Sequence, residues 1–148
     1  MILVDANLLI YAVNADAPDH AEAKNWVEAV LSGTETVGFA WVVLLAFLRV
    51  TTRPGLLARP LSVTSALDLV DSWLAQACVI TVDPTPQHAG ILRDLLLPMG
   101  TGGNLTSDAH LAALAIEHGA ELCSLDNDFA RFPRLRWRNP LLGRGQRG

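Results

Sequence analysis

Short, mostly apolar runs alternate with longer helical patterns along the whole chain, and this alternation restricts the fold more than any other feature. The first run, Ile2–Val4, is apolar throughout and ends at Asp5, as expected of a strand buried on both faces of a sheet. Four similar runs follow, at residues 36–39, 78–82, 121–125 and 135–137. Helical periodicity occupies most of the remaining chain, at residues 7–13, 20–31, 42–52, 62–76, 86–97 and 106–118. The segment 42–52 is apolar on every side, as a fully buried helix would be.

The alternation predicts one α/β domain. Strands separated by helices form a mainly parallel sheet with helices on both faces, which is a three-layer α/β/α sandwich. We expect residues 1–140 to form this domain and residues 141–148 to form a C-terminal tail rich in arginine and glycine. The length of 148 residues suits a single domain. Hydrophobic residues make up 51% of the chain and charged residues 18%, which excludes an intrinsically disordered protein.

Neither a membrane protein nor a secreted protein is indicated. The longest uncharged apolar stretch, residues 36–48, is shorter than the roughly 20 residues that a membrane-spanning helix needs. The chain does not open with a signal peptide, because its first apolar run leads directly into Asp5. We therefore expect a cytoplasmic protein. Cys78 and Cys123 are too few for a disulfide framework and lack the spacing of a metal site, so we interpret both as small buried side chains.

Four aspartates stand where an α/β sheet binds its ligands, outside the carboxyl ends of the strands. Asp5 follows the first strand, and Asp126 and Asp128 follow the fourth. Asp108 lies in the first turn of the helix at residues 106–118. Carboxylates gathered at one site repel one another and need a cation. Oxygen donors without thiolate or imidazole favour Mg²⁺ or Mn²⁺ over zinc, so the sequence predicts a site for one of these ions.

Each aspartate also has an ordinary structural explanation. Asp5 could cap the helix that follows it, and Asp108 could complement the dipole of its own helix. Turn formation alone accounts for at least one carboxylate of Asp126 and Asp128. Other catalytic classes lack their motifs, since the sequence contains no GxGxxG, no GxxxxGK[ST], no Gly-x-Ser-x-Gly and no metal-ligand spacing among its four histidines. The joint placement of the aspartates is what favours a metal site.

Charge is distributed unevenly along the chain. All fifteen acidic residues and five of the eleven basic ones lie within residues 1–128, whereas residues 129–148 hold six arginines and no acid. Trp137 lies between two of these arginines, and an aromatic ring among arginines is typical of surfaces that bind single-stranded nucleic acid. The candidates for nucleic-acid binding are Arg131, Arg136 and Arg138. A solvated basic tail, or a tail that binds an acidic partner, is the alternative.

Three segments resemble the motifs of PIN-domain ribonucleases, and most closely those of the VapC-type toxins of bacterial toxin–antitoxin pairs. The opening strand and helix of these proteins resemble residues 2–11, ILVDANLLIY. Their third acidic motif resembles residues 103–112, GNLTSDAHLA, and the fourth resembles residues 124–129, SLDNDF. The three segments keep the order and spacing of the family across residues 1–140, which makes the combination specific.

The resemblance implies a PIN-like fold and a Mg²⁺- or Mn²⁺-dependent endoribonuclease that hydrolyses cellular RNA. It also implies a VapB-type antitoxin that inhibits the enzyme, and a homodimer. Asp5 and Asp108 match the most dependable metal ligands of the family. Asp126 matches the acid after the fourth strand and completes the catalytic candidates, with Asp128 as a neighbouring ligand. Further polar candidates beside the metal are Asn7, Thr106 and Ser107.

One position departs from the family pattern. The family usually carries a glutamate on the helix after the second strand, and the matching residue here is Leu44. No acid occurs between residues 42 and 48, so the ligands would be three carboxylates or fewer, together with water molecules. Two alternatives stay open. One is a catalytically weak or inactive PIN-like module that binds RNA or a protein, and the other is an enzyme that hydrolyses a small phosphate ester with one Mg²⁺.

Overall fold

A five-stranded parallel sheet forms the centre of the computed structural model, which describes residues 1–103 and 105–142. Its strands are short: β1 (Ile2–Val4), β2 (Val37–Phe39), β3 (Val79–Thr81), β4 (Glu121–Cys123) and β5 (Trp137–Arg138). They lie in the order β3-β2-β1-β4-β5, and every neighbouring pair is parallel. Most of the predicted tail, residues 143–148, lies outside the described residues.

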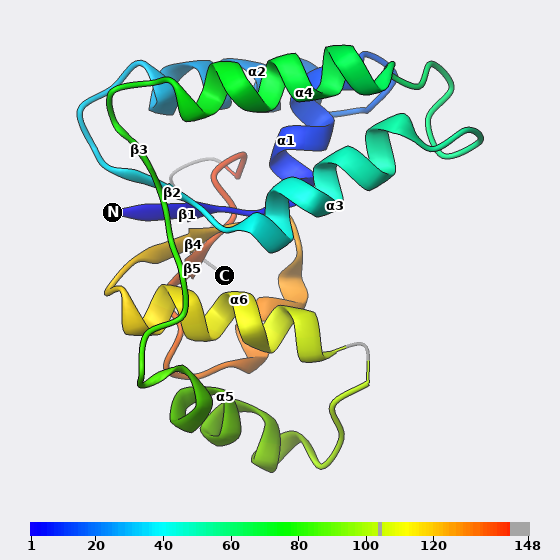
Figure 1. The fold of residues 1–148 in the computed structure, drawn as a ribbon. Helices are drawn as coiled ribbons and strands as arrows, with labels where there is room; N and C mark the ends of the chain where they lie inside the picture. The colour runs from blue at the N-terminus through cyan, green and yellow to red at the C-terminus, as the bar shows by residue number, and fades with distance from the viewer. Residues whose placement is uncertain (104, 143–148) are drawn as a thin grey trace.

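Helices cover both faces of this sheet, as the alternation predicts. Figure 1 shows α1 to α4 on one face and α5 and α6 on the other. Their bounds are α1 (Ala6–Val13), α2 (His20–Leu31), α3 (Trp41–Thr52), α4 (Val63–Leu74), α5 (His88–Leu96) and α6 (Leu105–Glu117), with two short 3₁₀ helices, η1 (Leu97–Met99) and η2 (Asn127–Arg131). The three-layer α/β/α sandwich is confirmed. Across the described parts of the chain, no helix is both long enough and apolar enough to cross a lipid bilayer.

The β1 strand is almost completely buried, because it lies in the middle of the sheet and helices cover both of its faces. Ile2, Leu3 and Val4 are each at most 2% exposed. The apolar run at residues 78–82 likewise predicts a buried strand, yet Ile80 in β3 is 46% exposed. Since β3 is an edge strand, it has a neighbour on one side only.

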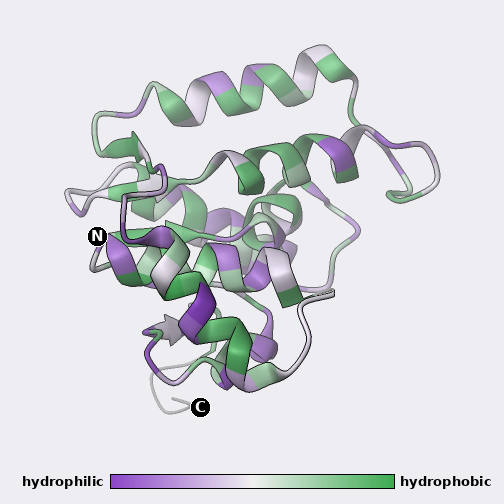
Figure 2. Ribbon diagram, turned by 60° about the horizontal axis from the view of Figure 1, so that its bottom comes forward, coloured by the Kyte–Doolittle hydropathy of each residue, from purple (hydrophilic) through white to green (hydrophobic). Residues whose placement is uncertain are grey.

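The α3 helix is buried on one face, although its apolar sequence predicts burial on every side. Leu44 and Phe47 are fully buried, whereas Trp41 is 48% exposed and Leu45 is 57% exposed. The buried face packs near α1 and α4, and the outer face has no helix against it in this single chain as far as it is described. Figure 2 shows hydrophobic and hydrophilic residues alternating along the helices, as is usual for helices that cover one face of a sheet.

The direction in which strands are added changes at β1. The chain passes outward from β1 through β2 to β3, and later places β4 on the other side of β1. In open parallel sheets a ligand crevice forms at such a point, outside the carboxyl ends of the two central strands. These ends are Val4 in β1 and Cys123 in β4, which are paired in register. The residues that follow, Asp5 and Ser124, therefore lie side by side.

A substitution at Gly38 in β2 tests how closely side chains pack against the sheet. A Cβ atom at Gly38 would overlap the Leu3 side chain and would lie 3.1 Å from Cγ1 of Val82. We expect Gly38→Ala to lower the free energy of unfolding by about 1–3 kcal/mol, the usual cost of overpacking a core, as measured by chemical denaturation. Gly90→Ala in α5 is the matched control, because a Cβ there would meet nothing within 4 Å. Equal effects of the two substitutions would contradict the prediction.

Candidate metal centre

Asp5 is held at the end of β1 by the neighbouring strand. Its backbone N–H donates to the carbonyl of Cys123 at 3.0 Å, which extends the pairing of β1 with β4 by one residue. Its Oδ1 accepts from the backbone N–H of Ala6 at 2.7 Å, so the carboxylate caps α1. Burial raises the pKa of Asp5 above its ordinary value, and the hydrogen bonds from Ser124 and Ala6 oppose this rise. Capping therefore explains one carboxylate oxygen and leaves Oδ2 to be explained.

A buried serine contacts that second oxygen. Ser124 is 0% exposed, and its Oγ donates to Asp5 Oδ2 at 2.7 Å. Asn7 lies beside both groups, with its Nδ2 3.1 Å from Ser124 Oγ and 3.4 Å from Asp5 Oδ2. The candidate Asn7 thus lies at the carboxylate, as expected. Sequence reasoning passed over Ser124, although its position directly after β4 was a usable signal.

Asp126 and Asp128 belong to the turn that opens η2. The backbone N–H of Asp126 donates to Ser124 Oγ at 3.0 Å, which ties the turn to the end of β4. Asp126 Oδ1 accepts from the backbone N–H of Asp128 at 2.9 Å, so turn formation occupies one oxygen, as the sequence suggested. Asp128 is exposed, and its Oδ1 lies 3.2 Å from Nη2 of Arg131. Asp126 is therefore joined to Asp5 through one hydroxyl, whereas Asp128 faces an arginine.

Asp108 approaches the same place from the first turn of α6. Burial raises the pKa of Asp108, and the negative charges of Asp126, Asp5 and Asp128 raise it further, while Arg131 lowers it. Such effects between charges fall off with distance, so Asp108 lies near enough to the other three aspartates for their charges to act on it. Thr106 and Ser107 are exposed in the same turn of α6. Their hydroxyl contacts beside a metal stay predictions.

The donor set fits a hydrated divalent cation better than a fully enclosed one. All the donors brought together are carboxylate oxygens, which suit Mg²⁺ or Mn²⁺. Among residues 1–103 and 105–142, no three His, Cys, Asp or Glu side chains converge closely enough to enclose a metal ion. Leu44 is fully buried in the core, and α3 supplies no acid. Because Mg²⁺ is commonly held by one or two carboxylates and several waters, the arrangement suits one such ion.

The three arginine candidates separate in the structure. Arg131 lies at the carboxylates, where it pairs with Asp128. Arg136 Nη2 donates to the carbonyl of Gly119 at 2.6 Å, and Arg138 Nε donates to Glu121 Oε1 at 2.9 Å. Gly119 and Glu121 lie at the start of β4, so these two side chains reach toward the opposite end of the sheet from Asp5. Their role in nucleic-acid binding stays a prediction.

His88 and His110 lie away from the four aspartates and contact each other. His110 faces α5, where its Nδ1 lies 2.9 Å from Nε2 of His88. His88 Nδ1 lies 3.0 Å from Oε2 of Glu117, whose side chain is 0% exposed. The three residues join α5 to α6, which agrees with a structural role.

Burial raises the pKa of Cys123 to about 12, so this thiol is the inert, buried side chain that the sequence indicates.

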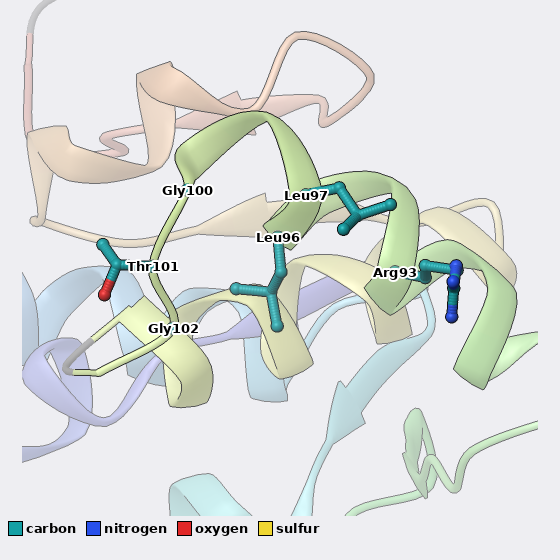
Figure 3. Close-up of a pocket in the computed structure, with 6 residues that line it drawn as sticks. All are labelled: Arg93, Leu96, Leu97, Gly100, Thr101 and Gly102. Atoms are coloured by element: carbon teal, nitrogen blue, oxygen red, sulfur yellow. The ribbon is translucent and has the colours of Figure 1, made fainter.

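A cavity of about 320 Å³ lies beside the loop that leads into α6 (Figure 3). Its lining consists of Arg93, Leu96, Leu97, Gly100, Thr101 and Gly102. None of the four aspartates is among these residues. The cavity is therefore separate from the carboxylate group and takes no part in holding the cation.

The chain is similar to known proteins over most of its length. The PIN domain family model matches residues 2–135. Ribonuclease VapC37 of Mycobacterium tuberculosis (strain ATCC 25618 / H37Rv) is 50% identical over 140 residues, which are 95% of this chain and 97% of that protein. Ribonuclease VapC33 of the same strain is 41% identical over 141 residues, or 95% of this chain and 99% of that protein.

Solved structures share the fold at lower identity. VapBC2 from Rickettsia felis, bound to a DNA fragment from its promoter, gives a TM-score of 0.67 at 19% identity, over 93% of this chain and 98% of that chain. VapC20 of Mycobacterium tuberculosis, a sarcin-ricin loop cleaving toxin, gives a TM-score of 0.65 at 18% identity, over 88% of this chain and 93% of that chain. At these identities the likeness concerns the fold.

The burial of Asp108, together with repulsion from the neighbouring carboxylates, predicts a pH-dependent cost in stability. Folding raises the pKa of Asp108 above 3.8, so this carboxylate binds a proton more strongly in the folded chain than in the unfolded chain. The folded chain therefore loses stability as pH rises from 3.8 through the raised pKa. In chelator at about pH 7, we expect Asp108→Asn to unfold about 1–3 °C above wild type in thermal scans. The difference should shrink as pH falls toward 3.8, and added Mg²⁺ should reduce it by stabilising wild type.

Asp71→Asn, at an exposed position of α4, is the matched control and should leave the unfolding temperature unchanged. A lower unfolding temperature for Asp108→Asn than for wild type, in chelator at neutral pH, would contradict the electrostatic account.

Proposed function

This chain belongs to the PIN-domain family, with VapC ribonucleases as close relatives, and we propose that it is an endoribonuclease whose metal centre is formed by Asp5, Asp108 and Asp126. The observation that carries the proposal is the link between Asp5 and Asp126 through Ser124 at the ends of β1 and β4, with Asp108 in the first turn of α6 close enough to feel their charges. Hydrolysis of a phosphodiester needs positive charge at the phosphate, and grouped carboxylates recruit that charge as a cation. Asp128 is a further ligand at the edge of the group.

The proposed cation is Mg²⁺, which Mn²⁺ can replace. Asp5 and Asp108 would hold it, and water molecules would complete its coordination because α3 offers Leu44 instead of an acid. When bound, the cation neutralises a non-bridging phosphate oxygen and makes a water molecule more acidic. Asp5 stays fixed by its hydrogen bonds to Ala6 and Ser124, so little reorganisation is needed.

Asp126 would act as the proton acceptor. Within the described residues, its Oδ1 accepts the backbone N–H of Asp128, and this leaves Oδ2 available. As the attacking water forms its bond to phosphorus, the bond to the leaving ribose oxygen breaks, and Asp126 Oδ2 takes the proton that the water loses. Thr106 and Ser107, exposed one and two residues before Asp108, would supply hydroxyls to the substrate or to ordered water.

Arg131 is the arginine best placed for RNA near the bond to be cut. Its Nε donates to the backbone carbonyl of Asp128 at 3.0 Å, and its side chain is 37% exposed. This anchoring leaves part of the guanidinium for a phosphate of the substrate. Arg136 and Arg138 would contact phosphates farther along the RNA, since their side chains bond to Gly119 and Glu121 at the start of β4.

The proposed partners are a VapB-type antitoxin and a second copy of this chain, and the proposed location is the cytoplasm. VapBC2 from Rickettsia felis, which shares the fold, is a complex of this kind. The outer face of α3, with Trp41 and Leu45 exposed, offers apolar surface for such contacts. In this reading the chain is the toxin of a toxin–antitoxin pair.

A module that binds RNA or a protein without cutting RNA is the second candidate. Leu44 favours it, because it stands where the family usually has a metal-ligating glutamate and is fully buried. The separation of the carboxylates also favours it, since no three acidic or imidazole side chains of the described residues enclose an ion. The two candidates differ in whether RNA is cleaved when a divalent cation is present.

Cleavage of total RNA by the partner-free protein separates these candidates. We expect cutting with Mg²⁺ or Mn²⁺ and none with chelator. Asp5→Asn and Asp108→Asn should each lower the rate by about a thousandfold, because loss of the cation removes several kcal/mol of transition-state stabilisation. Asp71→Asn is the control and should cut like wild type. If wild type cuts no RNA from a broad pool with either cation, the binding module is the correct function.

RNA binding in chelator tests the arginine assignment. Arg131→Ala should weaken binding and reduce the slope of log affinity against log salt by about one, as expected for loss of a single phosphate contact. Arg53→Ala, at an exposed position just after α3, is the control and should leave affinity and slope unchanged. Equal losses for the two variants would show that binding depends on overall charge and would contradict a specific role for Arg131.

A further inference from the structure

Ser124 lies between the two segments that carry Asp5 and Asp126, directly after β4. We propose that its hydroxyl is the positioning group of the metal centre, which holds the Asp5 carboxylate so that Oδ1 would be free to meet a cation. This inference rests on the proposed function, because it concerns the same centre. It concerns a residue that does not itself need to touch the cation or the RNA.

The direction of the Ser124 hydroxyl follows from its neighbours. A hydroxyl has one proton to donate and two lone pairs that accept. The backbone N–H of Asp126 donates to Ser124 Oγ at 3.0 Å, and Nδ2 of Asn7 lies 3.1 Å from it. Asn7 is oriented independently, because its Oδ1 accepts from the N–H of Leu125 at 3.2 Å and so its Nδ2 faces the serine. With both lone pairs occupied, the single proton of Ser124 points to Asp5 Oδ2, 2.7 Å away.

The number of hydrogen bonds that each oxygen of Asp5 accepts distinguishes the two oxygens. Oδ2 accepts from Ser124 at 2.7 Å and from Asn7 Nδ2 at 3.4 Å, which fills both of its lone-pair directions. Oδ1 accepts from the Ala6 N–H at 2.7 Å, and within the described residues this is its one hydrogen bond. The lone pair left for a cation is therefore on Oδ1.

Ser124 also links two site residues that follow different strands. Its Oγ contacts the side chain of Asp5 after β1 and the backbone of Asp126 after β4. Because Ser124 is 0% exposed, water does not readily take the place of a missing hydroxyl. Loss of the hydroxyl would free Asp5 Oδ2 and leave two N–H donors without their acceptor. Both carboxylates would then lose their fixed separation, and groups that orient ligands in this way typically change metal affinity by about 10- to 100-fold.

Binding of Mn²⁺ to the RNA-free full-length chain, followed by electron paramagnetic resonance of the free ion, tests the proposal. We expect Ser124→Ala to weaken Mn²⁺ binding by about tenfold or more. Ser124→Cys keeps the side-chain size but is a poor hydrogen-bond donor, so it should fold like wild type and bind Mn²⁺ as weakly as Ser124→Ala. Ser124→Thr keeps the hydroxyl and should restore binding to within about threefold of wild type.

Ser72→Ala is the matched control, since Ser72 lies on the exposed side of α4 and donates only to the Leu69 carbonyl at 2.7 Å. It should bind Mn²⁺ like wild type. RNA affinity in chelator should be the same for all the variants, because the hydroxyl acts on the cation and not on the RNA. Unfolding temperatures show which variants are folded under the conditions of the measurement.

Unchanged Mn²⁺ binding in folded Ser124→Ala or Ser124→Cys would overturn the positioning role. If wild type cleaves RNA with Mg²⁺ and Ser124→Ala needs no more Mg²⁺ than wild type, the positioning role fails while the proposed function stands. If wild type binds Mn²⁺ in a Ser124-dependent way but cleaves no RNA, the positioning role stands while the proposed function fails. Absence of Mn²⁺ binding to wild type would overturn both.

Discussion

The pairing of β1 with β4 is the constraint on which the proposed metal centre depends. Val4 lies opposite Cys123, and the hydrogen bond from Asp5 to the Cys123 carbonyl continues this register past the end of the strand. Asp5 and Ser124, 119 residues apart in the chain, meet as a consequence. A register shift of one residue would turn the side chains of one strand to the other face and separate them. The near-complete burial of β1 keeps the register fixed, because a shift would disturb a strand packed on both faces.

The fold holds together charges that repel one another. Asp5 and Asp108 both have raised pKa values, in each case mainly through burial and partly through neighbouring carboxylates. The hydrophobic core around the sheet supplies the free energy that keeps these groups close, since the aspartates themselves oppose it. This is a common compromise at functional sites, where stability is lower than the same fold could reach. A cation relieves the repulsion, so the affinity for metal and the strain of the metal-free chain have the same electrostatic origin.

Sequence patterns predicted most of the fold and the placement of acidic residues after the strands, and they failed where neighbouring elements decide the outcome. The five strands, the six helices and the positions of the four aspartates could be read from apolar runs and helical periodicity. The last strand is Trp137–Arg138 rather than residues 135–137, because a two-residue strand has its bounds set by its pairing with Leu122 and Cys123. Trp41 and Leu45 are exposed despite an apolar helix, because no element covers the outer side of α3 in the described chain.

The sequence by itself determined the alternating α/β architecture, the kinds of donor at the strand ends and the absence of an acid in α3. These are local properties, since periodicity and residue type act over a few neighbouring positions. Only the tertiary structure decided that Ser124 joins Asp5 to Asp126, that Arg131 alone among the three arginine candidates lies at the carboxylates, and that Leu44 faces the core. Such facts depend on strand order, register and burial, which arise from contacts between segments far apart in the chain. Apart from the position of Ser124 directly after a predicted strand, a single sequence carries no local signal for them.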